Sequence, residues 1–387
     1  MNLSKTIKAF FVALFAIAIV SCSTSPEKRA DQELNKILKQ FNAVGIGAAV
    51  VKDGRLIYNQ SVGYKNLENK IPLKNEDIFR IASISKSFTA TGIMQLVDQK
   101  KLSLDDDISD LIGFKIRNPY FPEKVITLRM IMSHTSSMSD AGGYFSLDPI
   151  NPAVTSDNSK SFNNYEPGTK YEYCNLGYNL TGSILEKVSG VRFDKYVKAN
   201  IIEKLGLYGG HNVNLLKPEL LVSLYDYTDS LGFINNDAEA YEKREEKIAN
   251  YTMGYSAPIF SPTGGVKISP KDLAKYMIMH INYGTANGET IISKESSQAM
   301  QEDIWKGEEG SDEYYGLALR SLEGWVEGKK LKGHTGSAYG VNSIMIFSPE
   351  EGWGIVAMTN GCNYGLQKES REFLKSSVSA LYNCFIK

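Results

Sequence analysis

The chain has 387 residues, of which 42% are hydrophobic and 22% are charged, a composition typical of a globular protein with a sizeable core. Its 43 lysines and arginines nearly balance 44 aspartates and glutamates, which leaves a net charge of -1. Because this balance comes without a basic block, we do not expect nucleic acid to be a partner.

The first 22 residues, "MNLSKTIKAFFVALFAIAIVSC", predict an export signal. Their apolar run, residues 9–20, is shorter than the ~17–25 residues that a membrane-spanning helix needs. The end of the stretch resembles the bacterial lipobox, in which the cysteine is lipidated and becomes the new N-terminus. We therefore expect a lipoprotein signal peptide over residues 1–21, a lipid on Cys22 and a disordered polar tether over residues 22–32. A plain signal peptide cleaved nearby is the alternative.

These features predict an exported bacterial lipoprotein that is anchored in a membrane and faces the periplasm. Ser23, which follows the cysteine, favours the outer membrane over the inner one.

The next elements in chain order are a hairpin and a helix. Residues 44–52 and 55–63 flank Asp53-Gly54, a strong signal for a two-residue hairpin turn. The segment 80–97, "RIASISKSFTATGIMQLV", then predicts an apolar helix from about Ser83 to Lys101. Helical spacing places Lys86 on the face that this helix buries, which is an unusual position for an ammonium group.

The middle of the chain has mixed character. Residues 176–188 and 193–204 have helical patterns, and residues 212–247 have weak periodicity that is typical of a variable insertion. Ser269-Pro270-Lys271-Asp272 predicts the start of another helix through a capping box.

The C-terminal third returns to strands. The segments "VNSIMIFSP" and "WGIVAMTN" predict a hairpin, and residues 367–384 predict a closing helix. Hairpins near both ends predict an antiparallel sheet built from both chain ends and flanked by helices, with a helix-rich lobe inserted. We expect an α/β lobe over about 33–88 and 262–387, and a helical lobe over about 89–261.

Cysteine and histidine patterns do not indicate a metal site. Cys174, Cys362 and Cys384 are too few and too scattered for a disulfide framework or a zinc site. Cys362 and Cys384 either form a disulfide or stay as buried free thiols. The four histidines lack metal-ligand spacing, so we expect neither a metal nor a cofactor.

Three motifs carry candidate chemistry. In Ser83-Ile84-Ser85-Lys86, a hydroxyl and an ammonium lie one helical turn apart at a helix start, which suits a serine nucleophile. In Tyr173-Cys174-Asn175, a tyrosine with its pKa lowered by a nearby ammonium would accept the serine proton. Asn175 would hold the substrate, although a core tyrosine and a helix-capping asparagine are the structural alternative.

The third motif is Gly333-His334-Thr335-Gly336-Ser337, on a predicted strand. Small residues let a substrate backbone pair along a strand edge, and the Ser337 N–H would join that of Ser83 as an oxyanion hole. The alternative is a strand interrupted by a glycine bulge. Two further features favour structural roles: Ser133-His134-Thr135-Ser136 as support, and Tyr314 with Tyr315 as core aromatics rather than cleft residues.

The order of the three motifs resembles the serine β-lactamase and penicillin-binding protein superfamily, nearest to its class C β-lactamase, DD-carboxypeptidase and esterase-like branch. The resemblance covers most of the chain except residues 207–260. Its blocks are "FRIASISKSFTATGIMQLVDQKKLSLDDDISDLI", "ITLRMIMSHTSSM", "EPGTKYEYCNLGYNLTGSILEKVSG", "SPTGGVKISPKDLAKYM", "GHTGSAYGVNSIMIFSPE" and "VAMTN".

The resemblance implies acyl transfer, with Ser83, Lys86 and Tyr173 as catalytic residues. Asn175, His334, Thr335 and Gly336 would bind substrate. His334 replaces the lysine of typical β-lactamases, so the resemblance favours a D-amino-acid peptidase or an acyl esterase over a β-lactamase. A catalytically silent lipoprotein that binds peptidoglycan or another ligand is the alternative of a different class.

Overall fold

The computed structural model of the chain describes residues 25–307, 314–363 and 367–387. The predicted signal peptide and the predicted lipidation at Cys22 lie outside these described residues. Within the described ranges, no helix combines the length and the apolar character needed to cross a membrane.

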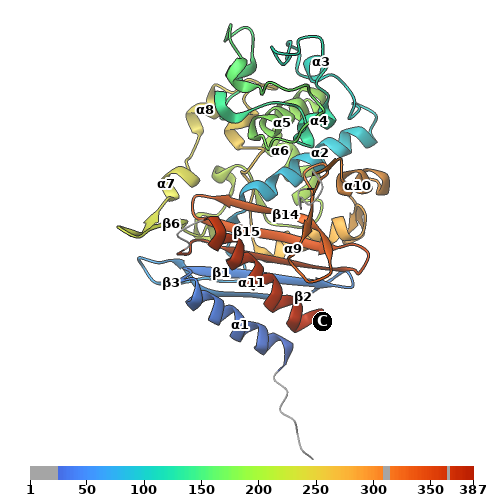
Figure 1. Ribbon diagram of the computed structural model, residues 1–387. Coiled ribbons are helices and arrows are strands. Elements are labelled where there is room, and N and C mark those ends of the chain that lie inside the picture. The colour runs from blue at the N-terminus through green and yellow to red at the C-terminus, as the bar shows by residue number, and fades with distance from the viewer. Residues whose placement is uncertain (1–24, 308–313, 364–366) are drawn as a thin grey trace, which may run out of the picture.

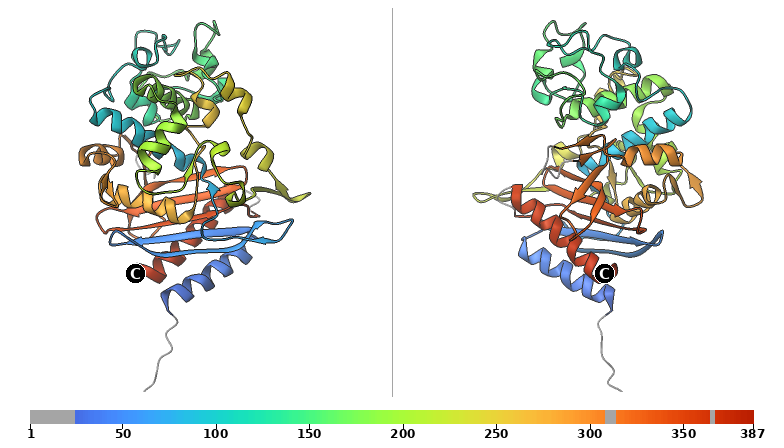
Figure 2. Two further views of the ribbon diagram at one scale, coloured as in Figure 1. Left: turned by 180° about the vertical axis from the view of Figure 1, so that it is seen from behind. Right: turned by 45° about the vertical axis from the view of Figure 1, so that its right-hand side comes forward.

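A nine-stranded antiparallel sheet lies between the two terminal helices and the helix-rich region (Figures 1 and 2). Its spatial order is β11-β12-β13-β14-β15-β16-β1-β2-β3. The central neighbours β1 and β16 come from opposite ends of the chain, which confirms the predicted fold class. The strands are β1 (Gly45–Lys52), β2 (Arg55–Asn66), β3 (Ile71–Pro72), β11 (Trp305–Lys306), β12 (Tyr314–Tyr315), β13 (Arg320–Glu323), β14 (Lys330–Ala338), β15 (Val341–Ser348) and β16 (Trp353–Thr359).

Both predicted hairpins are present, β1–β2 and β15–β16. In the first, Asp53 and Gly54 have φ values of 52° and 70°. Two consecutive left-handed residues form the type of turn that matches the twist of the flanking strands.

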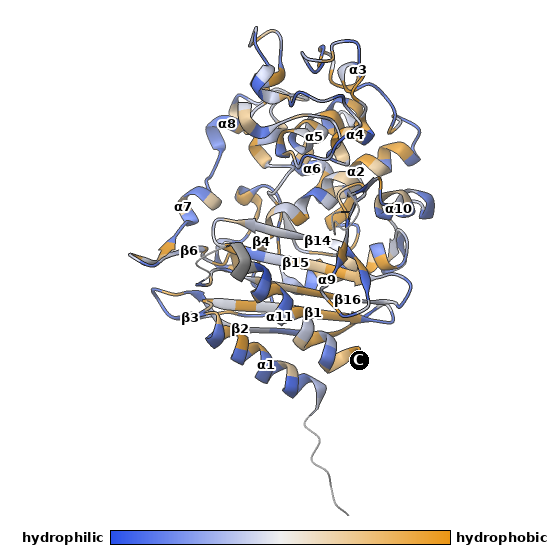
Figure 3. Cartoon of the chain, in the orientation of Figure 1, coloured by the Kyte–Doolittle hydropathy of each residue, from blue (hydrophilic) through white to orange (hydrophobic). Residues whose placement is uncertain are grey.

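The sheet is covered on both faces, because side chains alternate along each strand. Ile46, Ala48 and Val50 of β1 pack toward the terminal helices α1 (Pro26–Gln40) and α11 (Gln367–Phe385). Ala49 and Val51 belong to the larger core on the other face, under α9 (Pro270–Ile281) and the helical region. Blue and orange residues alternate along α1 in Figure 3, as expected for a helix with one apolar face.

Helix α1 corrects the prediction for the start of the folded chain. Ser25 caps the helix by accepting the N–H of Lys28 at 3.3 Å, and Pro26 occupies the first helical position. Ala30, Leu34 and Ile37 are buried. The prediction of a disordered tether was therefore wrong for residues 26–32, because capping signals start a helix there.

The helix-rich region follows the first hairpin. It contains the predicted long helix as a 3₁₀ turn, η1 (Ala82–Ile84), that leads into α2. The predicted helices at 176–188 and 193–204 appear as α5 and as α6 with a π-helical extension over 198–202. The helices are α2 (Ser85–Asp98), α3 (Ile108–Ile112), α4 (Leu128–Met132), α5 (Asn175–Ser189), α6 (Phe193–Val197), α7 (Asp237–Ala240), α8 (Glu245–Ala249) and α10 (Lys294–Gln301).

Short strands connect this region to the sheet. A three-stranded sheet joins β4 (Phe79–Arg80), β8 (Lys267–Ile268) and β5 (Gly209–Gly210), and β4 comes directly before the turn that carries Ser83. The stretch 212–247 contains the hairpin of β6 (Tyr225–Thr228) and β7 (Gly232–Asn235). A third small pair joins β9 (Thr285–Ala286) and β10 (Glu289–Thr290).

Candidate active site

Ser83 lies on a strained turn that is held from both sides. The preceding residue, Ala82, has a φ of 46°, a conformation that costs energy for a residue with a Cβ atom. The N–H of Ile81 donates to the Val266 carbonyl at 3.0 Å, and the Ser343 hydroxyl donates to the Ile81 carbonyl at 3.0 Å. The turn leaves Ser83 half-buried, whereas residues 84–96, which follow it, are buried.

Lys86 is fully buried and points at the serine. Its Nζ lies 3.1 Å from Ser83 Oγ, 2.9 Å from Asn175 Oδ1 and 3.0 Å from the Thr263 carbonyl oxygen. It also lies 4.7 Å from the ring centroid of Tyr173. The three oxygens match the three N–H groups of an ammonium, and they explain how a lysine occupies the buried face of α2.

The environment of Lys86 suits proton transfer. Burial lowers the pKa of Lys86 to about 7, although the Asp140 carboxylate acts in the opposite direction. When the amine is neutral, its two N–H groups donate to Asn175 Oδ1 and the Thr263 carbonyl oxygen, and its lone pair faces Ser83 Oγ. Near neutral pH, Lys86 is therefore placed to accept the serine proton.

Tyr173 differs from the prediction. Burial raises its pKa above the ordinary value of 10, and a side-chain hydrogen bond with Ser83 offsets only part of this effect. The prediction that the nearby ammonium would lower the pKa of Tyr173 was wrong, because loss of solvent outweighs the hydrogen bond with Ser83 and the charge of Arg320, which both lower it. Tyr173 is a neutral phenol at neutral pH, able to pass a proton but not to act as a phenolate base.

Asp140 is a site residue that the sequence analysis missed. Its carboxylate accepts the Asn175 N–H at 3.0 Å, the Asn175 Nδ2–H at 2.8 Å and the Leu176 N–H at 2.9 Å. It therefore caps α5 and turns Asn175 Oδ1 toward Lys86, where the Thr263 hydroxyl also donates to it at 2.6 Å. No sequence signal linked Asp140 to Asn175, because 35 residues separate them.

Strand β14 brings the third motif to the serine. β13 pairs with β14 from Lys330 to Gly333, and the register stops there. A Cβ at Gly336 would lie 2.2 Å from the Ile81 carbonyl oxygen, so glycine lets β14 approach the nucleophile turn. The two backbone segments of the predicted oxyanion hole, at Ser83 and Ser337, pack together at this point. The N–H pairing itself stays a prediction.

His334 is buried in a hydrogen-bonded chain with His134. The Cys174 N–H donates to His134 Nδ1 at 3.1 Å, and His134 Nε2 lies 3.2 Å from the Tyr315 hydroxyl. That hydroxyl lies 3.1 Å from His334 Nε2, and His334 Nδ1 contacts the Thr335 carbonyl. One set of tautomers satisfies every contact: His134 donates to Tyr315, which donates to His334 Nε2.

These hydrogen bonds determine which protonation state and which free ring atoms His334 can offer to a substrate. Burial lowers the pKa of His334 and of His134 well below 6.5, so both rings are neutral at pH 7. Both nitrogens of His334 are occupied within the protein. His134 lies 4.3 Å from the Tyr173 ring, centroid to centroid, which agrees with the predicted supporting role.

Arg320 of β13 is a second residue that the sequence analysis missed. It lies opposite Gly333 in the sheet register and its guanidinium carbon is 6.0 Å from the Tyr315 ring centroid. Its Nε is buried without a hydrogen-bond partner among the described residues. Arg320 and Lys86 are the two cations whose charges lower the pKa of His334.

The cysteines contribute no cross-link or metal ligand to the described structure. Cys174, Cys362 and Cys384 are not joined in disulfide bonds, so the disulfide alternative for the last two is wrong. Within the described ranges, no group of three histidine, cysteine or acidic side chains is arranged to hold a metal ion.

Comparison with known proteins gives matches over most of the chain. A family model described as Beta-lactamase matches residues 34–374. Penicillin-binding protein 4* of Bacillus subtilis (strain 168) is 26% identical over 334 residues, which cover 79% of this chain. The match spans 65% of that relative's length.

Solved structures share the fold. The octameric penicillin-binding protein homologue from Pyrococcus abyssi has a TM-score of 0.73 at 26% identity, over 92% of this chain and 77% of that one. D-amino acid amidase from Ochrobactrum anthropi SV3 has a TM-score of 0.70 at 20% identity, over 92% of this chain and 99% of that one. The protein therefore belongs to the β-lactamase family, a family of serine hydrolases.

Proposed function

We propose that the protein hydrolyses an amide or ester bond through an acyl-enzyme on Ser83. The observation that carries this proposal is the position of Lys86, fully buried, 3.1 Å from Ser83 Oγ and held by two other oxygens. A buried lysine with a pKa of about 7 is costly for stability and useful for proton transfer. This cost argues against the catalytically silent alternative.

The proposed reaction has two steps. Ser83 Oγ attacks the substrate carbonyl carbon while neutral Lys86 takes its proton, and the N–H groups of Ser83 and Ser337 stabilise the oxyanion. The bond to the leaving group breaks as Tyr173 passes a proton to it. Water then attacks the acyl carbon and loses a proton to the same residues. The bond between the acyl carbon and Ser83 Oγ breaks, Oγ takes that proton, and the carboxylic acid leaves with Lys86 neutral again.

For the substrate, we favour a D-amino-acid peptide with a free carboxylate. Arg320 supports this choice, because it is half-buried opposite Gly333 of the third motif and its Nε has no hydrogen-bond partner among the described residues. Neutral His334 supports the second candidate, an acyl ester, and weakens the β-lactamase alternative. The names of the similar proteins, a penicillin-binding protein and a D-amino acid amidase, agree with the first candidate.

An activity-based probe tests the enzyme proposal. A fluorophosphonate and a fluorescent penicillin should label the wild type and the distant Ser189→Ala control, but not Ser83→Ala. Absence of Ser83-dependent labelling, together with no hydrolysis of D-Ala-D-Ala peptides, acyl esters or β-lactams, would refute it.

The Arg320→Gln variant separates the two substrates. For a carboxylate-bearing peptide we expect KM to rise ~10-fold or more, since a charge-assisted hydrogen bond contributes roughly 1.5–3 kcal/mol. For a neutral ester, KM should stay within about twofold. Equal effects on both would remove Arg320 from substrate recognition.

We also propose that the protein is an exported lipoprotein anchored through Cys22. Radiolabelled palmitate should be incorporated by the full-length wild type and not by Cys22→Ala. Label in both variants, or in neither, would contradict the anchor.

A further inference from the structure

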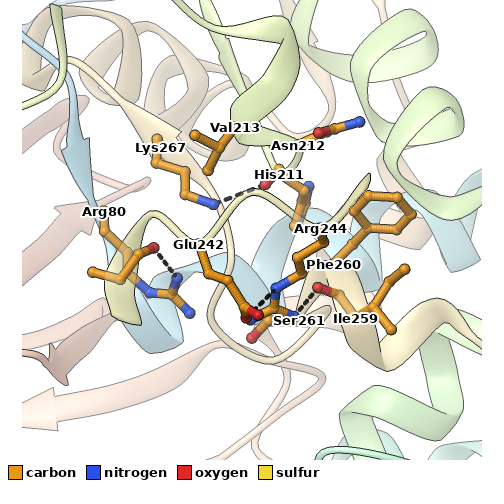
Figure 4. Close-up of a pocket in the computed structure, with 11 residues that line it drawn as sticks. Arg80, His211, Asn212, Val213, Glu242, Arg244, Ile259, Phe260, Ser261 and Lys267 are labelled. Atoms are coloured by element: carbon orange, nitrogen blue, oxygen red, sulfur yellow. Dashed lines mark hydrogen bonds and ion pairs between the residues drawn. The ribbon is translucent and has the colours of Figure 1, made fainter. Parts of the chain in front are cut away.

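A second group of buried cations lies beside the segments that carry the nucleophile. Arg80 and Lys267 are direct partners in the β4–β8 register, and both line a cavity of about 20 Å³ (Figure 4). Arg80 comes three residues before Ser83, and Lys267 follows the loop whose Thr263 carbonyl contacts Lys86. The cavity and the active site therefore share two backbone segments.

The two cations have neutral partners. Lys267 is 3% exposed, and its Nζ donates to the His211 carbonyl at 2.8 Å. Arg80 is 7% exposed; it donates to the Ala240 carbonyl at 3.1 Å and lies 5.0 Å from the Tyr339 ring centroid. In the described part of the chain, the charges that act on Lys267 are those of Arg80 and Arg244, so neighbours add repulsion.

Glu242 is the only carboxylate that lines the cavity among the described residues, and other cations share it. Arg244 Nε lies 3.3 Å from its Oε2, and Lys247 Nζ lies 3.3 Å from its Oε1. The Glu242 side chain is also 45% exposed, which weakens its field at Lys267. Arg80 and Arg244 therefore outnumber the one carboxylate and leave the cavity positively charged, although burial lowers the pKa of Lys267 well below 10.5.

Several polar atoms at the cavity lack a partner. Burial lowers the pKa of His211 well below 6.5, so its neutral ring has one donor nitrogen and one acceptor nitrogen. Arg80 Nε and both ring nitrogens of His211 are buried without a hydrogen bond in the described structure, and His211 is 3% exposed. Such unpaired groups are costly in a protein interior, and burying like charges together adds to the cost. An anion in the cavity would supply the missing acceptors and the missing charge.

We propose that this cavity binds a small oxyanion, either a carboxylate or free phosphate or sulfate. Its volume of about 20 Å³ exceeds what one water molecule requires. Arg80, Lys267 and His211 would donate to the oxyanion from three different segments. A larger hollow of about 530 Å³, which shares Glu242, Arg244 and Ile259 with the cavity, adjoins it.

Thermal unfolding and calorimetry test the site without requiring enzymatic activity. At constant ionic strength, held with a bulky buffer anion, phosphate or sulfate should raise the wild-type melting temperature by several degrees in a saturable way. Lys267→Met should weaken the Kd at least 10-fold, and the surface control Lys204→Met should leave it unchanged. Arg244→Gln, at a less buried position, is the second variant should Lys267→Met fail to fold.

Two ester substrates show whether the oxyanion in the cavity belongs to the substrate or is free in solution. This ester experiment rests on the proposed function, because it requires hydrolysis by Ser83. We compare p-nitrophenyl hemisuccinate, which carries a carboxylate, with neutral p-nitrophenyl butyrate. If a substrate carboxylate occupies the cavity, the kcat/KM preference for the anionic ester should fall ~10-fold in Lys267→Met, and phosphate should compete. If free oxyanion occupies it, the thermal shift should occur and the ester preference should be equal in both proteins.

The proposal is overturned if phosphate and sulfate give no saturable shift, or if Lys267→Met responds like the wild type. If the protein hydrolyses none of the tested substrates but phosphate still raises its melting temperature in a Lys267-dependent way, the proposed function is refuted and the oxyanion site is supported.

Discussion

Lys86 and Lys267 are both buried lysines, and their surroundings differ. Lys86 has three oxygens within 3.1 Å of Nζ, and the Asp140 carboxylate keeps its pKa from falling below about 7. Among the described residues, Lys267 Nζ has one carbonyl partner, that of His211, and two neighbouring arginines, and burial lowers its pKa well below 10.5. The first environment supports proton transfer within the protein, whereas the second requires charge from outside it.

The largest expected effect follows from removing the amine that the site uses. Lys86→Met should lower kcat/KM by ~1,000-fold or more, since the serine loses its base. The same variant should be more stable than the wild type at pH 6 by ~2 kcal/mol, because a buried charge is removed.

The pH dependence checks this stability gain. The folded pKa of Lys86, about 7, is below the unfolded value of 10.5, so the unfolded chain binds more protons between these limits. The cost of burying the charge is complete below pH 7 and absent above pH 10.5. Urea unfolding should therefore show a gain that is largest near pH 6 and fades toward pH 10; a gain independent of pH would contradict it.

Asp140→Asn tests the counter-charge that distinguishes the two lysines. Because Asp140 raises the pKa of Lys86, the variant should move the ascending limb of the pH–kcat/KM profile to below its wild-type midpoint near 7. Weaker acceptance of the Asn175 and Leu176 N–H groups should also cost ~1–3 kcal/mol of stability. An unchanged midpoint would show that Asp140 acts only as a helix cap.

Lys267→Met tests the second lysine, which has no catalytic role in the proposed reaction. Without oxyanion, the variant should be more stable than the wild type by ~1 kcal/mol, because no described acid balances the lysine. Chemical denaturation in a phosphate-free buffer measures this difference. A loss of stability of similar size would mean that Lys267 has adequate partners within the protein.

The smallest effect is expected for the coupling between Lys267 and Arg244. A double-mutant cycle of Lys267→Met and Arg244→Gln should give a repulsive coupling of ~0.5 kcal/mol without oxyanion. Saturating sulfate should abolish this coupling energy or make it favourable. A favourable coupling in both conditions would contradict mutual repulsion.

The active site was only partly predictable from the sequence. Ser83 and Lys86 were identified together because three residues along a helix fix their separation to a few ångströms. Asp140, Arg320 and the pairing of His134 with Tyr315 were missed, since each reaches the site from a distant segment with no fixed spacing. The pKa of Tyr173 was predicted in the wrong direction because burial depends on everything that packs around it.

The hairpins, the main helices and the order of the three motifs could be predicted from local sequence patterns. These features depend on local hydrogen bonds, turn residues and periodicity, and the Asp53-Gly54 turn is the clearest case. The folded structure was needed to establish that α1 begins at Pro26, that both nitrogens of His334 have partners within the protein, and that Arg80 lies beside Lys267. Desolvation and charge pairing arise between segments far apart in the chain, so they exist only once the fold has formed.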